Sequence, residues 1–283
     1  MTMASARDWV SKSPYTNALG IAFESASDDE AVLRLAFNKD NTNQTGVLHG
    51  GIAASLGNAA SMAMALQALP AESGPLHTAN YSISYLTAAV GVDLVSRARL
   101  LRKGRDLAFI DVAIEAADGT KIASAQSVVR GRKGQEKPRL ATAAEPPEAT
   151  VTPPNQARIR ENAFMGGRGM DISVQEKGIA VMTLPGLPQN AEAGGGMHEG
   201  AVLGLMDSCG AMACWGLTGL GQFRASTPAI QASVVGPVPL TDLMASARVM
   251  QQDGEIYWVD VNTANAKTRE IHARATVLYR IVT

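Results

Sequence analysis

Several features are scarce in this 283-residue chain, and each scarcity narrows the class of protein. The formal net charge is only −1, so the charge balance favours neither a nucleic-acid partner nor an anionic membrane surface. No run of about 18 apolar residues is uninterrupted, which argues against a membrane span. The N-terminal segment MTMASARDWV has no apolar stretch behind a basic start, so we expect a cytoplasmic protein.

Cysteine and histidine are also rare. The two cysteines, Cys209 and Cys214, lie five positions apart in one predicted helix and are too few for a disulfide framework or a zinc site. We expect them to be buried as small apolar residues. The four histidines show no metal-ligand spacing, so we expect no metal and no bound cofactor.

The chain contains an internal repeat with an offset of 149 residues. The segment NQTGVLHGG at 43–51 corresponds to EAGGGMHEG at 192–200, and a long Ala-, Leu- and Met-rich segment follows each copy. Nine residues after His49 stands Asn58, whereas nine residues after His198 stands Asp207. One copy therefore has an amide where the other has a carboxylate, and we expect the two copies to differ in chemistry.

Both copies predict the same order of elements, which is typical of an α+β fold. A short strand (31–37 and 180–184) precedes a Gly-containing loop, and an apolar helix follows (51–69 and 200–217). Such a helix must be buried on most of its surface, and a curled antiparallel sheet supplies that burial. The strands of the first copy are expected at 79–86, 93–102, 107–116 and 121–130. The segment 131–156 contains five prolines and predicts an extended linker between units 1–130 and 157–283.

The His-Gly loop and the helix acid are the best candidates for chemistry. Gly50 and Gly51 place backbone N–H groups at a helix N-terminus, which suits a developing oxyanion. The alternative is that the two glycines only form the turn and that His49 caps the helix. Asp207 interrupts an apolar helix, where an unpaired carboxylate is costly. It is either a general base or nucleophile, or a carboxylate satisfied by Ser208 or a backbone donor.

These motifs resemble the hotdog-fold acyl-CoA thioesterases of the phenylacetyl-CoA (PaaI-like) type. The resemblance covers nearly the whole chain outside the linker and implies two tandem hotdog units, each a central helix wrapped by a curved antiparallel sheet. The first unit carries the closest match, at Asn43, Gly46, Leu48, His49, Gly50, Gly51, Lys103, Gly104, Leu107, Ala108 and Phe109.

In the family each active site is shared between two units, so the resemblance implies two unlike sites here. The first combines Asn43, His49 and Gly50 of one unit with Asp207 and Thr227 of the other, and it is complete. In the second site the carboxylate is replaced by an amide and Gly-Gly by Glu-Gly. That degenerate second site consists of Asn58, Thr78, His198 and Glu199.

The resemblance implies hydrolysis of an acyl-CoA thioester to a carboxylic acid and CoA. Gly50 would polarise the carbonyl, while Asp207, assisted by Thr227, would activate water or attack the carbonyl itself. Gly51, Lys103 and Arg105 are the expected substrate-binding residues, the two basic ones for the CoA phosphates or else on a solvated strand edge. The alternative function is a non-catalytic module that binds or senses acyl-CoA. A homodimer is expected on the resemblance alone.

Overall fold

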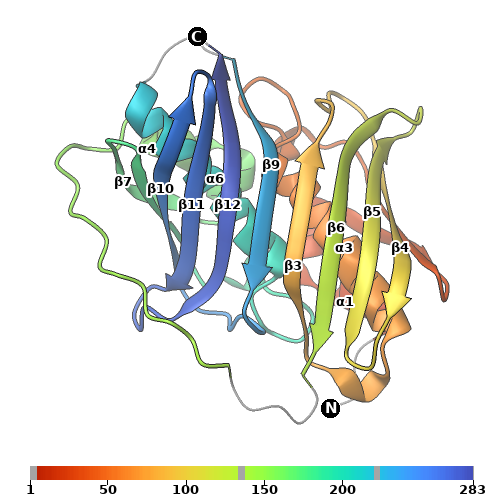
Figure 1. The fold of residues 1–283 in the computed structure, drawn as a ribbon. Coiled ribbons are helices and arrows are strands. Elements are labelled where there is room, and N and C mark those ends of the chain that lie inside the picture. Colours follow the sequence, from red (N-terminus) through yellow and green to blue (C-terminus); the bar gives the residue numbers. More distant parts are fainter. Residues whose placement is uncertain (1–4, 133–137, 220–223, 283) are drawn as a thin grey trace.

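The computed structural model describes residues 5–132, 138–219 and 224–282. Its elements fall into two similar sets that confirm the predicted pair of tandem hotdog units (Figure 1). The first set consists of α1 (Ala6–Lys12), α2 (Pro14–Leu19), β1 (Ile21–Ala26), β2 (Glu30–Leu35), η1 (Lys39–Asn41), α3 (Gly50–Ala68), η2 (Ala71–Ser73), β3 (Leu76–Tyr85), β4 (Leu94–Lys103), β5 (Leu107–Ala116) and β6 (Lys121–Gly131). The second consists of α4 (Gln156–Glu161), α5 (Ala163–Gly167), β7 (Asp171–Glu176), β8 (Ile179–Leu184), η3 (Pro188–Asn190), α6 (Glu199–Thr218), β9 (Arg224–Val234), β10 (Leu243–Asp253), β11 (Ile256–Asn265) and β12 (Ile271–Val282).

One twelve-stranded antiparallel sheet runs through both units in the order β1-β2-β4-β5-β6-β3-β9-β12-β11-β10-β8-β7. The units join where β3 pairs with β9, at the centre of the sheet in Figure 1. In this pairing Ser82 lies opposite Gln231, its own counterpart at the 149-residue offset. The two units are therefore related by an approximate two-fold axis at this pair. Because β3 and β9 are antiparallel, the start of β3 lies at the end of the sheet where β9 finishes.

The long helices α3 and α6 pack against the sheet and against each other, and these contacts form the core. Both are buried over most of their length because their residues are apolar and small. Gly57 shows how closely α3 approaches the sheet, since an added Cβ would lie 2.4 Å from the Tyr81 hydroxyl. The helix α6 is long and apolar enough to span a membrane, but 72% of its apolar window is buried inside the fold, as in a core helix.

The short elements at the start of each unit were not predicted. The sequence predicts one strand at the start of each unit. In the structure, two short helices and a further strand precede it: α1, α2 and β1 in the first unit, and α4, α5 and β7 in the second. These helices are only five to seven residues long, too short for an apolar periodicity to mark them.

The predicted linker is extended in the part that the structure describes. Residues 133–137 of it lie outside the described residues, and residues 138–155 form no helix or strand apart from one isolated bridge, between Thr142 and Glu270. Ala143 donates to the carbonyl of Arg269, and Ile271 donates to the carbonyl of Ala141, so the linker follows the second unit. The unit boundaries at 130 and 157 stay predictions, although the order of elements repeats on either side.

Candidate active site

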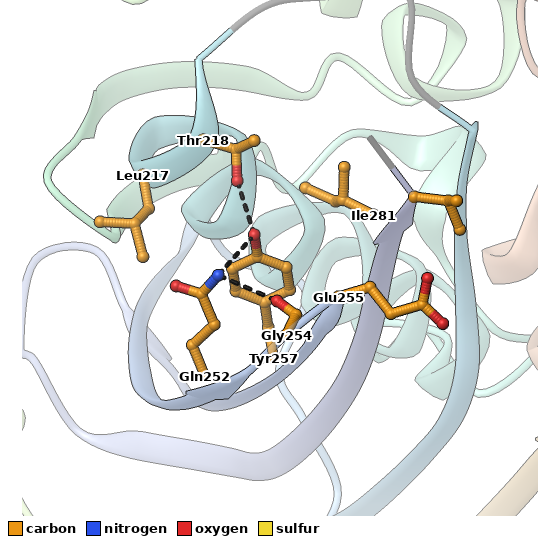
Figure 2. A pocket seen from close by; sticks show the side chains of 8 residues that line it. Leu217, Thr218, Gln252, Gly254, Glu255, Tyr257 and Ile281 are labelled. Carbon is orange, nitrogen blue, oxygen red and sulfur yellow. Dashed lines mark hydrogen bonds between the residues drawn. The ribbon is translucent and has the colours of Figure 1, made fainter.

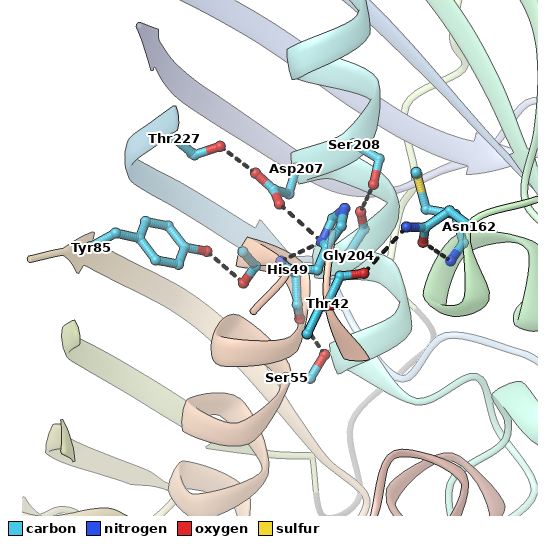
Figure 3. A network of polar contacts seen from close by, with 12 residues as sticks. Thr42, His49, Ser55, Tyr85, Asn162, Gly204, Asp207, Ser208 and Thr227 are labelled. Carbon is cyan, nitrogen blue, oxygen red and sulfur yellow. Dashed lines mark hydrogen bonds and ion pairs between the residues drawn. The ribbon is translucent and has the colours of Figure 1, made fainter. Parts of the chain in front are cut away.

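The N-terminus of α3 meets the middle of α6 at a buried carboxylate (Figure 3). His49 is the N-cap of α3, and its Nδ1 accepts a hydrogen bond of 3.1 Å from the Gly51 N–H. The same Nδ1 lies 3.7 Å from Oδ2 of Asp207. A Cβ added to Gly50 would lie 2.8 Å from that oxygen, so only glycine leaves the carboxylate in place.

Thr227, near the start of β9, holds the other oxygen of the carboxylate. Its hydroxyl donates a 2.7 Å hydrogen bond to Oδ1 of Asp207. Ser208 does not fill this role, because its hydroxyl donates to the carbonyl of Gly204 within the helix. Asp207 is thus held at Oδ1, while Oδ2 faces the His-Gly loop of the first unit.

Burial sets the charge states of the two titratable groups. Asp207 is 4% exposed, and burial raises the pKa of its carboxyl above the usual range, against the opposing effects of His49 and of hydrogen bonds from Thr227 and the Gly51 backbone. Burial also lowers the pKa of His49, which makes the neutral imidazole the favoured form. Since Nδ1 accepts the Gly51 N–H, the hydrogen-bond pattern assigns the ring proton to Nε2.

The backbone at Gly50 is available to an anion. The first N–H groups of a helix have no partner inside the helix, and Gly51 is satisfied by His49. No described residue accepts a hydrogen bond from the Gly50 N–H. This group stands at the positive end of a 19-residue helix and beside Asp207, where a substrate carbonyl would find both a donor and a base.

Two aromatic residues complete this site and were missed by sequence reasoning. The Tyr85 hydroxyl donates 3.0 Å to the Gly50 carbonyl, and burial, Asp207 and Tyr81 all raise its pKa. The Phe164 ring lies 4.8 Å from the His49 ring. The repeat held a usable signal for Tyr85, because its counterpart at the 149-residue offset is Val234 and the position is therefore asymmetric.

Asn43 is not brought to the carboxylate. Its Oδ1 accepts hydrogen bonds from the Thr45 N–H (2.9 Å), the Thr45 hydroxyl (2.7 Å) and the Val47 N–H (3.2 Å), all within its own exposed loop. The side chain therefore shapes the His-Gly loop rather than lining the space in front of Asp207.

The second site holds a carboxylate that comes from a different position. Glu199, the counterpart of Gly50, reaches Thr78 and Asn58 and is 8% exposed. Its Oε1 accepts the Thr78 N–H (2.9 Å) and its Oε2 accepts the Asn58 amide (3.3 Å), which also donates to the Thr78 hydroxyl. Burial raises the pKa of Glu199. The glutamate side chain thus occupies the space that glycine leaves open in the first site.

Aromatic side chains from the first unit cover this second site. The Tyr15 ring stacks on His198 at 4.7 Å, and the Trp9 ring lies 5.0 Å away. The indole N–H of Trp9 donates a 2.6 Å hydrogen bond to Glu192 in the loop. His198 is completely buried, which lowers its pKa to about 3. His198 is thus fully buried, whereas the side chain of His49 is 12% exposed.

Lys103 and Arg105 lie at the sheet end that carries Thr78, not Thr227. They belong to the β4–β5 hairpin, where Leu107 pairs with Arg130, and Arg130 in turn pairs with His77. Because β3 and β9 are antiparallel, Thr227 is at the opposite end. The structure does not bring these two cations to Asp207, and their role in substrate binding stays a prediction.

An open pocket at the C-terminus of α6 is separate from this site (Figure 2). Thr218 and Gln252 both hydrogen-bond the Tyr257 hydroxyl there, at 2.9 and 3.1 Å. Neither Asp207 nor the His-Gly loop lines it. Across the described residues, no group of three or more His, Cys, Asp or Glu side chains is arranged to hold a metal ion.

Comparison with known proteins agrees with the fold. The family model described as "Domain of unknown function (DUF4442)" matches residues 5–130. Acyl-coenzyme A thioesterase 13 of Homo sapiens is 32% identical over 115 residues, which cover 40% of this chain and 76% of that protein.

Solved structures resemble the whole chain. A protein of hot dog fold from Alicyclobacillus acidocaldarius has a TM-score of 0.66 at 13% identity and covers 99% of both chains. The acyl-CoA thioesterase II TesB2 of Mycobacterium marinum has a TM-score of 0.63 at 11% identity, over 94% of this chain and 96% of that one. At 11–13% identity these structures show the fold alone. The human thioesterase, at 32% identity over 76% of its length, shows the family. The chain therefore belongs to the hotdog-fold thioesterase family.

Proposed function

We propose that this protein is an acyl-CoA thioesterase of the PaaI-like type, with one working active site between its two units. The observation that carries the proposal is the buried Asp207 carboxylate, held by Thr227 and facing the Gly50 backbone at a helix N-terminus. A carboxylate fixed beside a helix N-terminus is the arrangement that a general base acting on a carbonyl substrate requires.

The geometry supports a direct sequence of steps. The Gly50 N–H donates to the thioester carbonyl and stabilises the oxyanion as water attacks the carbonyl carbon. Asp207 takes the proton from that water. The C–S bond then breaks, and the departing CoA thiolate recovers the proton from Asp207, so that a carboxylic acid and CoA are released. His49 positions the loop by accepting the Gly51 N–H.

Asp207→Asn tests the base. Loss of a general base costs about 10²–10⁴ in rate, equivalent to roughly 2.7–5.4 kcal/mol on the barrier. The matched control is Asn58→Ala, the counterpart position in the covered site, and we expect nearly unchanged turnover. The measurement is free-thiol release from short, medium, long and aromatic acyl-CoAs. Comparable losses in both variants would overturn the assignment of one working site.

The same assay separates the enzyme from the alternative. A protein that binds CoA saturably but releases no thiol from any of these substrates would be a non-catalytic acyl-CoA module. Release by the native protein and not by Asp207→Asn supports the enzyme, and the panel then identifies the acyl class.

A further inference from the structure

In the second site, aromatic side chains of the first unit cover the His198 ring. Trp9 on α1 lies over His198 and is joined to the loop through its hydrogen bond to Glu192. Glu192 is the counterpart of Asn43 at the 149-residue offset. In the first site, the side-chain oxygen of Asn43 accepts hydrogen bonds from Thr45 and Val47 of its own loop. Among the described residues, no hydrogen bond joins Asn43 to helix α4 in the way that Glu192 is joined to α1.

The helices over the first loop take the same position as those over the second. Phe164 on α5 lies 4.8 Å from the His49 ring, and its counterpart Tyr15 lies 4.7 Å from the His198 ring. The loop carbonyls correspond as well: Thr42 accepts a hydrogen bond from α5's N-cap, and its counterpart Ala191 accepts one from α2.

The first helix of each pair also matches. Gln156 on α4 donates to the carbonyl of Ile172, and its counterpart Arg7 on α1 lies over the ring of Phe23, the counterpart of Ile172. The residue that stands where Trp9 stands in α1 is therefore Arg158 in α4. The repeat thus places an exposed arginine on α4 at the position where α1 carries the indole that covers His198.

Arg158 is exposed and forms no ion pair with any described residue, whereas Arg160 on the same helix pairs with Asp171 at 2.6 Å. A second cation, Lys39 on η1, stands where the other unit has Pro188. Helix α5 packs both on η1 and on α4, so it lies between the segments that carry Lys39 and Arg158. Asp40 is exposed beside Lys39 on η1, and its negative charge offsets that of Lys39. Attraction of an anion to this surface therefore depends mainly on Arg158.

We propose that Arg158, assisted by Lys39, binds the nucleotide phosphates of CoA at the entrance to the working site. The inference rests on the proposed function. A guanidinium pairs with phosphate through two parallel hydrogen bonds and stays charged at every working pH. The pantetheine arm separates the phosphates from the thioester, so an exposed cation on the surface and a buried carboxylate suit the two ends of one substrate.

Arg158→Ala is the test, with Arg160→Ala as the control of equal charge change on the same helix. We expect the KM for acyl-CoA to rise roughly tenfold in Arg158→Ala, the effect of losing one hydrogen-bonded charge pair, with kcat near the native value. The N-acetylcysteamine thioester of the same acyl group has no phosphates, and its kcat/KM should be unchanged. Arg160→Ala should keep the native KM for both substrates, and Arg158→Lys should recover part of the loss.

The outcomes distinguish this inference from the proposed function. If the native protein hydrolyses the N-acetylcysteamine thioester while Arg158→Ala keeps the native KM for acyl-CoA, the phosphate site is wrong and the thioesterase stands. If instead the double change Lys103→Ala and Arg105→Ala raises that KM, the phosphates bind at the other sheet end. If no thioester is hydrolysed, calorimetric binding of CoA decides: tenfold weaker binding by Arg158→Ala supports the site, and equal binding overturns it.

Discussion

Replacing Gly50 by alanine tests the close approach on which the working site depends. The new Cβ would lie 2.8 Å from Oδ2 of Asp207. Ordinary contact needs about 3.5 Å, so the carboxylate must move by roughly 0.7 Å. A misplacement of about 1 Å at a reacting group costs on the order of 10² in rate, or about 2.7 kcal/mol on the barrier. We therefore expect a loss of kcat approaching a hundredfold.

The fold should tolerate this change. The atom that must move is the end of a side chain, and alanine is a better helix residue than glycine by about 1 kcal/mol. Initial rates of thiol release at saturating acyl-CoA, together with urea unfolding, separate the two effects. Gly167→Ala is the control, because its Cβ would meet nothing within 4 Å. A Gly50→Ala enzyme with native kcat would refute the placement of the carbonyl between Gly50 and Asp207.

Two further substitutions test the shifted pKa values of Asp207 and Glu199. Activity needs ionised Asp207 and is lost as pH falls through its pKa, and Thr227 lowers that pKa. Thr227→Val should therefore move the acid limb of kcat/KM to higher pH, whereas Thr78→Val should leave it in place. Burial raises the pKa of Glu199, so the folded state holds this proton more tightly than the unfolded chain and stability falls as pH rises through that pKa. Glu199→Gln should raise the free energy of unfolding at pH 7 by on the order of 1 kcal/mol. This gain in stability should disappear as the pH is lowered to the usual pKa range of a glutamic acid, where the carboxyl is protonated in both states. Urea unfolding at several pH values measures it, and a pH-independent difference would contradict this reasoning.

The regular elements of both units were predictable because burial marks them in the sequence. The central helix expected at 51–69 is α3 (Gly50–Ala68), and the one expected at 200–217 is α6 (Glu199–Thr218). A helix that is apolar on most of its surface must be buried, and the curled antiparallel sheet supplies most of that burial. The short helices α1 and α5 carry no such mark, yet Trp9 of α1 lies against His198 and Phe164 of α5 lies against His49.

The site was predictable where residue type carries the chemistry. Asp207 is conspicuous in an apolar helix, and Gly50 follows a capping histidine. The positive charges of Lys103 and Arg105 predicted that they bind the CoA phosphates. Charge does not indicate at which end of the sheet their hairpin lies, and the hairpin lies at the end opposite Thr227. Tyr85 was missed because a tyrosine in a strand is ordinary until a neighbour such as the Gly50 carbonyl is known.

The internal repeat alone shows that the chain is double and that its halves are unequal, because a 149-residue offset sets Asp207 against Asn58 and Gly50 against Glu199. Which of these residues meet depends on how the two units pack. The antiparallel pairing of β3 with β9 relates the units by a two-fold axis and brings Asp207 to Gly50 and Asn58 to Glu199. Such contacts join residues more than a hundred positions apart. The packing of two helices and one sheet fixes them, and no local pattern in the chain records them.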